Sequence, residues 1–267
     1  MSRSLNGRDR ATGIACPICG TDMTESMVKA RVELLDCECG FISIDLRTWK
    51  YPYSDKDYYE GQAEMPGGPD NASILHRVEQ LRRHLKGGLV GDLGSGNGLL
   101  PLALARGGYH AVGVEESFAM VAWLRERFPE VEWQQRDILE YLSARRQHDG
   151  ITMYHVLEHI PAPRNVVRLL ADSIRKGGVL VVEVPDVSGG RARILGGKWG
   201  GYMEHHVNYF SLQTLTALLV PYGFELLECE RKYHMATPGT TMWRNAVHGL
   251  LLKIGINDII ATVWKRV

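Results

Sequence analysis

The stretch Val90–Gly98, with the sequence Val-Gly-Asp-Leu-Gly-Ser-Gly-Asn-Gly, decides the fold of this chain. The apolar residues 88–90 lead into it and predict a buried strand, and residues 99–105 follow it and predict a helix. Glycine lets a turn between strand and helix tighten, and it lets ligand atoms approach the backbone. The stretch therefore predicts the first unit of a nucleotide-binding α/β sheet.

The spacing of the glycines distinguishes between ligands. A dinucleotide fingerprint is G-x-G-x-x-G with a pyrophosphate on the helix N-terminus, whereas this turn has the pattern D-x-G-x-G-x-G. A carboxylate at Asp92 repels a pyrophosphate but can hold a cation, directly or through water. The pattern favours the ammonium end of S-adenosylmethionine, and the alternative is a glycine turn in another α/β enzyme, such as an oxidoreductase.

Composition excludes several classes of protein. The 267 residues include 31 Lys and Arg and 31 Asp and Glu, so the net charge gives no sign of a nucleic-acid or membrane partner. No uncharged apolar run approaches about 20 residues, and residues 1–12 are polar, without the apolar core of a signal peptide. We expect a cytoplasmic protein with a disordered tail at 1–12.

Four of the five cysteines form two tight pairs, each followed by glycine: Cys16, Cys19, Cys37 and Cys39. In a cytosolic protein such pairs favour a metal over disulfides, and four thiolates suit tetrahedral Zn²⁺. Four protein ligands leave no open position, so the predicted zinc is structural. Reduced, inert thiols or a redox pair are the alternatives.

The order of predicted elements divides the chain into a zinc-binding head with an aromatic linker at 13–65 and an α/β domain at 71–267. Asn71 is positioned to cap a helix that ends before Gly87, and its basic face, with Arg77, predicts a solvated surface. Residues 110–115 predict a second strand that ends in Glu115. This acid lies roughly 20 residues after Gly94, where a carboxylate can accept both hydroxyls of a ribose.

A histidine-rich turn follows the predicted strand 148–154. It contains His155, Glu158 and His159, and the strand order places it beside the glycine turn. A histidine near neutral pKa can accept a proton from a hydroxyl or an amine. The alternative is structural: His159 caps or packs the turn, while Tyr154 and His155 only shape the pocket.

The C-terminal third completes the sheet. Lys176–Gly178 predicts a helix end before a fifth strand, and residues 186–204 predict a long glycine-rich loop that acts as a lid, recognises the acceptor, or is simply solvated. Ser211 is positioned to cap a helix, and residues 223–229 predict the sixth strand. Residues 242–253 predict a further helix, and 259–265 an antiparallel seventh strand.

The glycine turn, the His-x-x-Glu-His turn, the Glu-x-Pro end of the fifth strand and the His-x-x-x-Phe-Ser run together resemble class I S-adenosylmethionine-dependent methyltransferases. They resemble in particular a bacterial branch with a cysteine-paired, zinc-ribbon-like head. The resemblance implies a Rossmann-like sheet of six parallel strands and an antiparallel seventh, preceded by a small zinc module. It also implies a set of cofactor-binding residues: Asp92, Gly94, Ser95, Gly96, Gly98, Glu115, Asp137, Ile138 and Tyr154. In this family an acid at the position of Asp137 faces the adenine amino group, and an apolar residue at the position of Ile138 faces the adenine ring. The tyrosines at 58–59 are similar to a pair that can line the entrance of the cofactor site in this family.

The resemblance also implies a function. Members of this branch methylate sugars, quinone precursors and secondary metabolites, mostly at oxygen, so a small-molecule acceptor is expected. One alternative is an RNA methyltransferase that uses the zinc module for RNA contact, although the neutral charge argues against RNA. Another is a catalytically silent cofactor-binding module.

The histidine turn is expected to carry the chemistry, with His155, Glu158, His159 and His206 as catalytic residues. Quinone-precursor and small-RNA 2′-O-methyltransferases carry a similar Glu-x-x-Glu-His turn, in which a divalent metal binds the acceptor hydroxyls. Here His155 replaces the first Glu, which shifts the set toward nitrogen ligands and weakens the case for Mg²⁺. We therefore favour a metal-free site, in which His155 or His159 takes the proton and His206 orients the acceptor.

Overall fold

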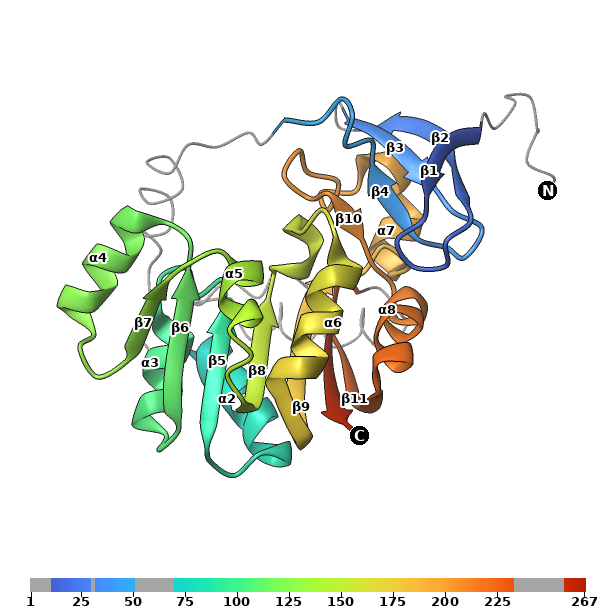
Figure 1. Cartoon of the computed structure of the whole chain (residues 1–267). Helices are drawn as coiled ribbons and strands as arrows, with labels where there is room; N and C mark the ends of the chain where they lie inside the picture. The colour runs from blue at the N-terminus through green and yellow to red at the C-terminus, as the bar shows by residue number, and fades with distance from the viewer. Residues whose placement is uncertain (1–10, 30–31, 51–69, 233–256) are drawn as a thin grey trace, which may run out of the picture.

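The computed structural model describes residues 11–29, 32–50, 70–232 and 257–267, which form a large and a small β-sheet with helices around the large one (Figure 1). The predicted tyrosine pair at 58–59 and the predicted helix at 242–253 lie outside these residues. Within them, no helix is long and apolar enough to cross a membrane.

The elements follow the predicted order. The N-terminal strands are β1 (Ala11–Ala15), β2 (Asp22–Lys29), β3 (Val32–Asp36) and β4 (Ile42–Ile44). The later strands are β5 (Leu89–Leu93), β6 (His110–Glu115), β7 (Glu132–Gln135), β8 (His148–Tyr154), β9 (Ile174–Pro185), β10 (Asn208–Tyr209), β11 (Phe224–Lys232) and β12 (Ile259–Arg266). The helices are α2 (Ala72–His84), α3 (Leu99–Arg106), α4 (Phe118–Arg127), α5 (Ile138–Ser143), α6 (Pro163–Ser173), α7 (Gly190–Leu195) and α8 (Leu212–Leu219), with 3₁₀ turns η1 (Leu157–His159), η2 (Gly196–Lys198) and η3 (Val220–Tyr222).

The large sheet has seven strands in the order β11-β12-β9-β8-β5-β6-β7. Strand β5 pairs in parallel with β6 and β8, and the pairs β6–β7 and β8–β9 are also parallel. Strand β12 is antiparallel to both β9 and β11, so six strands run one way and one runs the other. This confirms the predicted Rossmann-like methyltransferase sheet.

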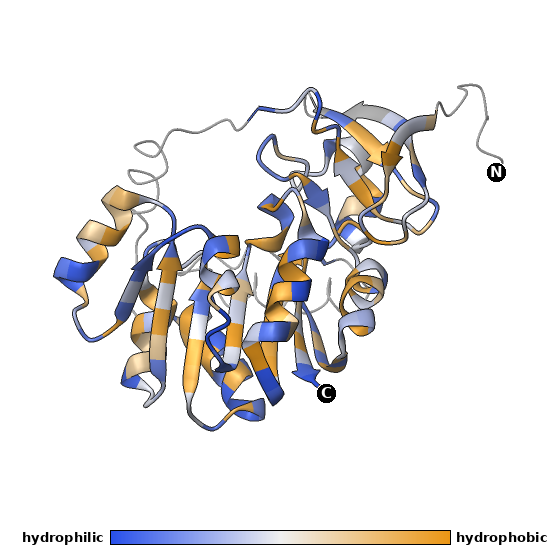
Figure 2. Cartoon of the chain, in the orientation of Figure 1, coloured by the Kyte–Doolittle hydropathy of each residue, from blue (hydrophilic) through white to orange (hydrophobic). Residues whose placement is uncertain are grey.

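Helices cover both faces of this sheet (Figure 1). On β9, Val179 and Val181 pack with helices α2 and α3, whereas Leu180 and Val182 pack with α5, α6 and α8. Alternate residues of a strand point to opposite faces, so a strand buried on both sides is a continuous apolar run. Figure 2 shows this apolar character along the central strands.

Side-chain caps fix where several helices begin. The Asn71 side chain accepts a hydrogen bond from the backbone N–H of Ser73, and Ser117 accepts one from Met120. Ser211 and Thr214 form a reciprocal capping box at α8. These caps satisfy N–H groups that have no partner within the helix, and they confirm the predicted helix starts at 71 and 211.

The cysteine head, defined here as residues 11–50, shares its sheet with the α/β domain. Strands β1 to β4 are joined by β10, which pairs with β4 so that Asn208 lies opposite Ser43 and Tyr209 opposite Ile42. The four strands of the head and the later strand β10 therefore form one sheet. Strand β1 also begins at Ala11, inside the expected N-terminal tail.

The structure differs from the prediction at one helix end and in one loop. Helix α6 already ends at Ser173, and β9 begins at Ile174, because an extended backbone buries the Ile174 side chain in the core. The predicted loop at 186–204 contains α7 and η2. It is fixed to the start of β12 because Arg191 and the buried Trp199 both contact the carboxylate of Asp258.

Candidate active site

The glycine turn lies at the carboxyl end of β5, where ligands of open α/β sheets bind. Asp92 is buried, and its Oδ1 accepts a hydrogen bond of 2.6 Å from the Thr152 hydroxyl on β8. Burial raises the pKa of Asp92 to about 7, although the hydrogen bond from Thr152 opposes the shift. A bound cation would restore the ionised form, so this carboxyl group fits the predicted ammonium-binding role.

The turn requires glycine at two positions for steric reasons. Gly94 has a φ of +71°, and a Cβ there would lie 2.6 Å from Val156. Gly98 has a φ of +74°, and a Cβ there would lie 2.4 Å from Leu124. Left-handed backbone favours glycine, and neither position has room for a side chain. The first contact also places the histidine turn directly against the glycine turn.

Glu115 ends β6 and supports the same turn. Its Oε2 accepts a hydrogen bond of 3.0 Å from the backbone N–H of Gly96, and its Oε1 accepts one of 3.1 Å from Ser117. The side chain is buried and is therefore held in one orientation. Each carboxylate oxygen can accept more than one hydrogen bond, so binding of ribose hydroxyls is compatible with these contacts.

Asp137 and Ile138 lie after the adjacent strand, β7. Asp137 is the N-cap of α5, and its Oδ1 accepts hydrogen bonds from Leu139 and Glu140. Its Oδ2 has no hydrogen bond within the described residues, and Ile138 packs partly against the core. The two residues lie on the expected edge of the sheet, and their roles at adenine stay predictions.

Tyr154 and Arg77 correct the expected solvated face of α2. The guanidinium of Arg77 lies 4.2 Å from the ring centre of Tyr154 and donates a hydrogen bond of 2.6 Å to Glu183 Oε1. Lys232 donates to the other oxygen of Glu183 at 2.8 Å. Burial raises the pKa of Tyr154 well above its ordinary value, so its hydroxyl stays protonated. Arg77 therefore belongs to the site.

His155 is held between two carboxylates. Its Nδ1 lies 3.3 Å from Glu158 Oε1, and its Nε2 lies 3.3 Å from Glu183 Oε1. Burial opposes the charged imidazole, but these two hydrogen bonds outweigh burial and raise the pKa of His155 to about 9. A ring that donates from both nitrogens is protonated, so His155 has no lone pair with which to accept a proton.

Glu158, His159 and His206 form a second cluster. His159 Nδ1 donates to the carbonyl of His205 at 2.8 Å, and His206 Nδ1 donates to the carbonyl of Gly201 at 2.9 Å. In a neutral ring such a bond fixes the tautomer, with the proton on Nδ1 and the lone pair on Nε2. Burial lowers the pKa of His206 to about 4, so its imidazole is neutral near pH 7.

Glu158 supplies the negative charge of this cluster. Burial opposes its ionisation, but the hydrogen bond from His155 keeps the pKa of Glu158 below its ordinary value. Its Oε2 is buried and accepts no hydrogen bond among the described residues. One ligand atom from each of Glu158, His159 and His206 lies within 4.8 Å of the others. The structure thus brings together three of the four predicted catalytic side chains, and it places His155 between Glu158 and Glu183.

The four predicted metal-binding cysteines converge in the head. The Sγ atoms of Cys16 and Cys39 are 3.8 Å apart, and those of Cys19 and Cys37 are 3.3 Å apart. With Zn–S bonds of about 2.3 Å, tetrahedral zinc holds its sulfurs about 3.8 Å apart. Each cysteine pair lies in a hydrogen-bonded backbone turn: the N–H of Gly20 donates to the carbonyl of Cys16, and the N–H of Gly40 donates to the carbonyl of Cys37. The donor set therefore fits Zn²⁺.

Four site residues were not predicted as site residues: Thr152, Arg77, Glu183 and Lys232. In the sequence, Glu183 was noted only as the acid of the Glu-x-Pro motif at a strand end. Other acids of the site also lie near strand ends. A buried acid before a strand end is a signal that could have identified it. Arg77 and Lys232 lie on distant elements, and only tertiary structure shows that both contact Glu183.

Comparison with known proteins decides the family. A family model described as a methyltransferase domain matches residues 69–229, from the residues before α2 into β11. The chain belongs to the methyltransferase-domain family. This confirms the predicted enzyme class, an S-adenosylmethionine-dependent methyltransferase. The match covers both the glycine turn and the histidine turn.

Sequence relatives match this enzyme over a shorter range. A ubiquinone biosynthesis O-methyltransferase of Salmonella enteritidis is 35% identical over 117 residues, which are 39% of this chain and 48% of the relative. One of Aeromonas salmonicida is 32% identical and covers 39% and 49%. The chain thus spans about half the length of the curated relatives it matches.

Solved structures share the fold. A SAM-dependent methyltransferase from Archaeoglobus fulgidus aligns with a TM-score of 0.58 and 16% identity over 78% of this chain and 99% of its own. The 1,6-didemethyltoxoflavin-N1-methyltransferase of Burkholderia thailandensis aligns with a TM-score of 0.55 and 16% identity over 91% and 98%. At such identities the likeness concerns the fold alone.

Proposed function

We propose that this methyltransferase transfers the methyl group of S-adenosylmethionine to a hydroxyl oxygen of a small molecule. The observation that supports the proposal most is the cluster of Glu158, His159 and His206, whose turn contacts the glycine turn. The partial similarity to ubiquinone biosynthesis O-methyltransferases supports oxygen as the methylated atom.

The cofactor binds, in this proposal, along the carboxyl edge of β5 to β8. Asp92 holds the ammonium group, Glu115 accepts the ribose hydroxyls, and Asp137 and Ile138 contact adenine. The backbone of the glycine turn, with Gly94, Ser95, Gly96 and Gly98, contacts the remainder. Tyr154, stacked on Arg77, borders the space near the reacting methyl group. When bound, S-adenosylmethionine supplies an electrophilic methyl group whose leaving sulfur takes the bonding electrons.

The histidine turn removes the acceptor's proton in this proposal. The Nε2 of His206 or His159 accepts the proton of the hydroxyl as the new carbon–oxygen bond forms. The buried carboxylate of Glu158 then stabilises the imidazolium that results. His155, held by Glu158 and Glu183, has a positioning role: it fixes the orientation of the Glu158 carboxylate. Most of the rate enhancement comes from alignment, because a cationic leaving group needs little further help.

A divalent metal at the same cluster is a second candidate, favoured by the unpartnered Oε2 of Glu158. Both imidazoles donate from Nδ1 to a carbonyl, an arrangement that orients metal-binding histidines in proteins. Two nitrogens and one oxygen fit Mn²⁺, Fe²⁺ or Zn²⁺ better than Mg²⁺. A metal would lower the pKa of the hydroxyl and orient it. The metal-free reaction remains the first proposal because neutral His206 beside ionised Glu158 suffices to accept a proton.

We further propose that the four cysteines of the head hold one structural Zn²⁺. Zinc there supplies no reaction step, since all four ligands come from the protein. It fixes the two cysteine turns of a segment too small to build a large core of its own.

The test is a panel of phenols, catechols and sugars incubated with S-adenosylmethionine, with release of S-adenosylhomocysteine as the measurement. His206→Ala and Glu158→Gln should each lower turnover by about 10²–10⁴-fold, the usual contribution of general acid–base catalysis. His110→Ala is the matched control, because this exposed histidine lies at the opposite end of β6. If His159→Ala, His206→Ala and Glu158→Gln all keep full turnover, the cluster is only structural.

Further outcomes separate the remaining candidates. Activity that vanishes after exhaustive mild chelation, with the head zinc retained, and returns with Mn²⁺ or Zn²⁺ would favour the metal version. RNA retention in a gel shift that weakens with salt would favour an RNA acceptor. Cofactor binding without turnover across the panel would favour a silent binding module.

A further inference from the structure

We propose that the cysteine head positions the acceptor half of the active site and that strand β10 transmits this effect. The inference rests on the proposed function in naming Glu158, His159 and His206 as the acceptor half and in placing a metal on the head cysteines. The contacts that carry it are present whatever the acceptor is.

The segment that bears His206 is hydrogen-bonded on both sides. On one side, the backbone N–H of Ile44 in the head donates to the carbonyl of Val207 at 3.0 Å. On the other, the N–H of Val207 donates to the carbonyl of Glu158 at 2.8 Å. Val207 therefore links strand β4 of the head to the histidine turn through a single residue.

Two more contacts extend this link on either side of His206. Trp49 Nε1 in the head donates to the carbonyl of Glu204 at 2.7 Å. Asn208 Nδ2 donates to the carbonyl of Ile160, just after the histidine turn, at 2.6 Å. The carbonyl of His205 in between accepts from His159 Nδ1. The backbone at 204–208 is thus the partner of both the head and the catalytic turn.

The apolar contacts follow the same path. Phe41 of the head and Phe210 after β10 are both fully buried, and their ring centres are 5.5 Å apart. A separate cluster joins Leu34 and Ile44 of the head to Val207 and to the buried residues of the 186–204 segment. Burial of these apolar and aromatic side chains stabilises the contact between the head and this segment.

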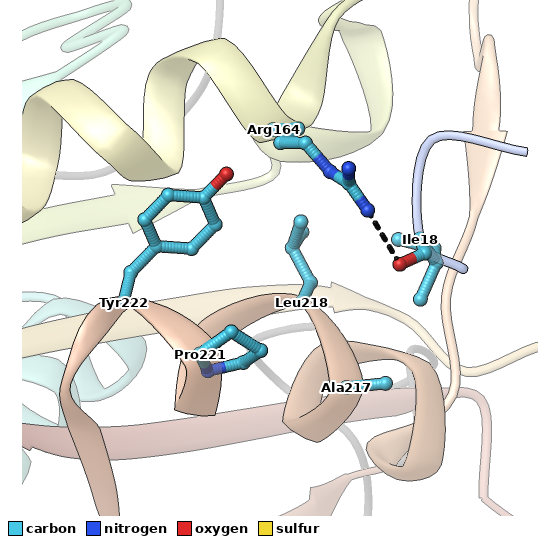
Figure 3. A pocket seen from close by; sticks show the side chains of 6 residues that line it. All are labelled: Ile18, Arg164, Ala217, Leu218, Pro221 and Tyr222. Atoms are coloured by element: carbon cyan, nitrogen blue, oxygen red, sulfur yellow. Dashed lines mark hydrogen bonds between the residues drawn. The ribbon is translucent and has the colours of Figure 1, made fainter. Parts of the chain in front are cut away.

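The cysteine turns are continuous with this interface. The turn that begins at Cys37 closes when its N–H donates to the carbonyl of Phe41 at 2.9 Å, so the ligand pair and the Phe41 ring are coupled. The other turn is bound by Arg164 of α6, whose guanidinium donates to the carbonyls of Pro17 and Ile18 at 2.9 and 2.7 Å. Figure 3 shows the hydrogen bond from Arg164 to Ile18, two residues that line one small pocket.

The cofactor half is held by other elements. The N–H groups of Gly94 and Ser95 donate to the carbonyl of Val114 on β6, and Thr152 on β8 donates to Asp92. Removing the metal from the head should therefore loosen residues 203–211 while the glycine turn keeps its shape. Affinity for the cofactor product should survive this loosening.

The experiment is hydrogen–deuterium exchange of the full chain, with and without the head metal. Elemental analysis gives the metal content, and Cys37→Ser provides a metal-deficient protein that needs no chelator. Amides of residues 203–211 should exchange at least about tenfold faster, whereas those of residues 89–98 should change less than twofold. The dissociation constant of S-adenosylhomocysteine should change less than threefold.

Trp49→Phe is a milder variant that leaves all four cysteines intact. It removes the Nε1–H donor to Glu204 and keeps an aromatic ring, so exchange at 203–211 should rise about threefold at unchanged metal content. Asp22→Asn, a change at an exposed residue at the start of β2, is the matched control. Spectra of ¹⁵N-histidine-labelled protein add a second measurement: the Nδ1–H tautomer of His206 should be lost in Cys37→Ser and kept in Asp22→Asn.

Two results would overturn the proposal. Unchanged exchange at 203–211 in Cys37→Ser, with faster exchange in the head, would show that the head is independent of the site. Equal acceleration at 203–211 and 89–98 would show that the head only stabilises the whole fold. Neither measurement uses an acceptor, so a failure of the proposed O-methylation is seen separately, in the turnover panel.

Discussion

Replacing Asp92 by Asn tests whether this buried carboxyl group binds the cofactor's ammonium group. Asn keeps the size of the side chain and an oxygen that can accept the Thr152 hydroxyl at the 2.6 Å position, so the turn should be preserved. Only the negative charge is lost. Hydrogen bonds to charged groups contribute about 1.5–3 kcal/mol. The variant should therefore bind S-adenosylhomocysteine about 10- to 150-fold more weakly, with a water-mediated contact at the low end.

Calorimetry with two ligands separates this effect from damage to the fold. S-Adenosylhomocysteine carries the ammonium group, whereas 5′-methylthioadenosine has the adenosine portion without it. Asp92→Asn should weaken the first ligand and leave the second within about twofold. Equal weakening of both ligands would mean that the variant distorts the turn. Unchanged binding of both would refute the ammonium role.

The pH dependence gives an independent check with a defined sign. Burial raises the pKa of Asp92 to about 7, above its ordinary value of 3.8, so the free enzyme carries a neutral carboxyl group below pH 7. An ammonium ligand prefers the ionised form, so binding releases a proton there. Wild-type affinity should fall up to about tenfold per pH unit below pH 7, and Asp92→Asn should show no such slope. A parallel slope in both proteins would assign the titration to another group.

Three other changes test the surrounding structure. Gly98→Ala should lower the free energy of unfolding in urea by about 2–4 kcal/mol, since its Cβ would lie 2.4 Å from Leu124 at positive φ. Gly108→Ala, which has a positive φ but open space around the Cβ, should lower it by about 1–2 kcal/mol. Equal losses in the two variants would exclude a packing effect at Gly98. Glu183→Gln should lower the pKa of His155, about 9 in the wild type, in an NMR titration. Because the pKa of His155 is raised, its ion pairs stabilise the folded state fully below pH 6.5, and this stabilisation is lost as the pH rises to about 9. The variant should therefore flatten this decline in the free energy of unfolding. An unchanged decline would contradict the ion pair. Elemental analysis should find one zinc per chain, whereas a mapped disulfide among the head cysteines would contradict a zinc site.

The large sheet was predictable from sequence because local patterns and chain order agree. The glycine turn marks β5, and β6, β8 and β9 contain apolar runs with a polar residue near the carboxyl end. Asn71 and Ser211 cap their helices as expected. Parallel strands meet their ligands at one edge, so the order of Asp92, Glu115 and the histidine turn already placed them together.

The junction with the head was not predictable in the same way. Strand β10 has only two residues, and its partner β4 lies more than 150 positions earlier in the chain. No periodicity can be read from a two-residue strand, and its composition, one asparagine and one tyrosine, also suits an ordinary loop before a helix. The cysteine pairs predicted a compact module, but they carried no information about which surface completes its sheet. The burial of Phe41 against Phe210, and of Leu34 and Ile44 against Val207, shows that the two parts share a core.

The spacing His-x-x-Glu-His left open which histidine accepts a proton, and the contacts of His155 bear on the proposed choice. His155 has a φ of +58°, a left-handed conformation that costs a non-glycine residue about 1–2 kcal/mol. In this conformation the ring lies 3.3 Å from a carboxylate oxygen of Glu158 and 3.3 Å from one of Glu183. A histidine so held is a fixed cation, and it orients Glu158 toward the other two histidines. In the proposed reaction, proton transfer is therefore assigned to His159 or His206, whose Nδ1 atoms donate to backbone carbonyls. His205 and His206 lie on the segment that the head contacts. The position of the cysteine head therefore bears on which histidine can act as the proposed base.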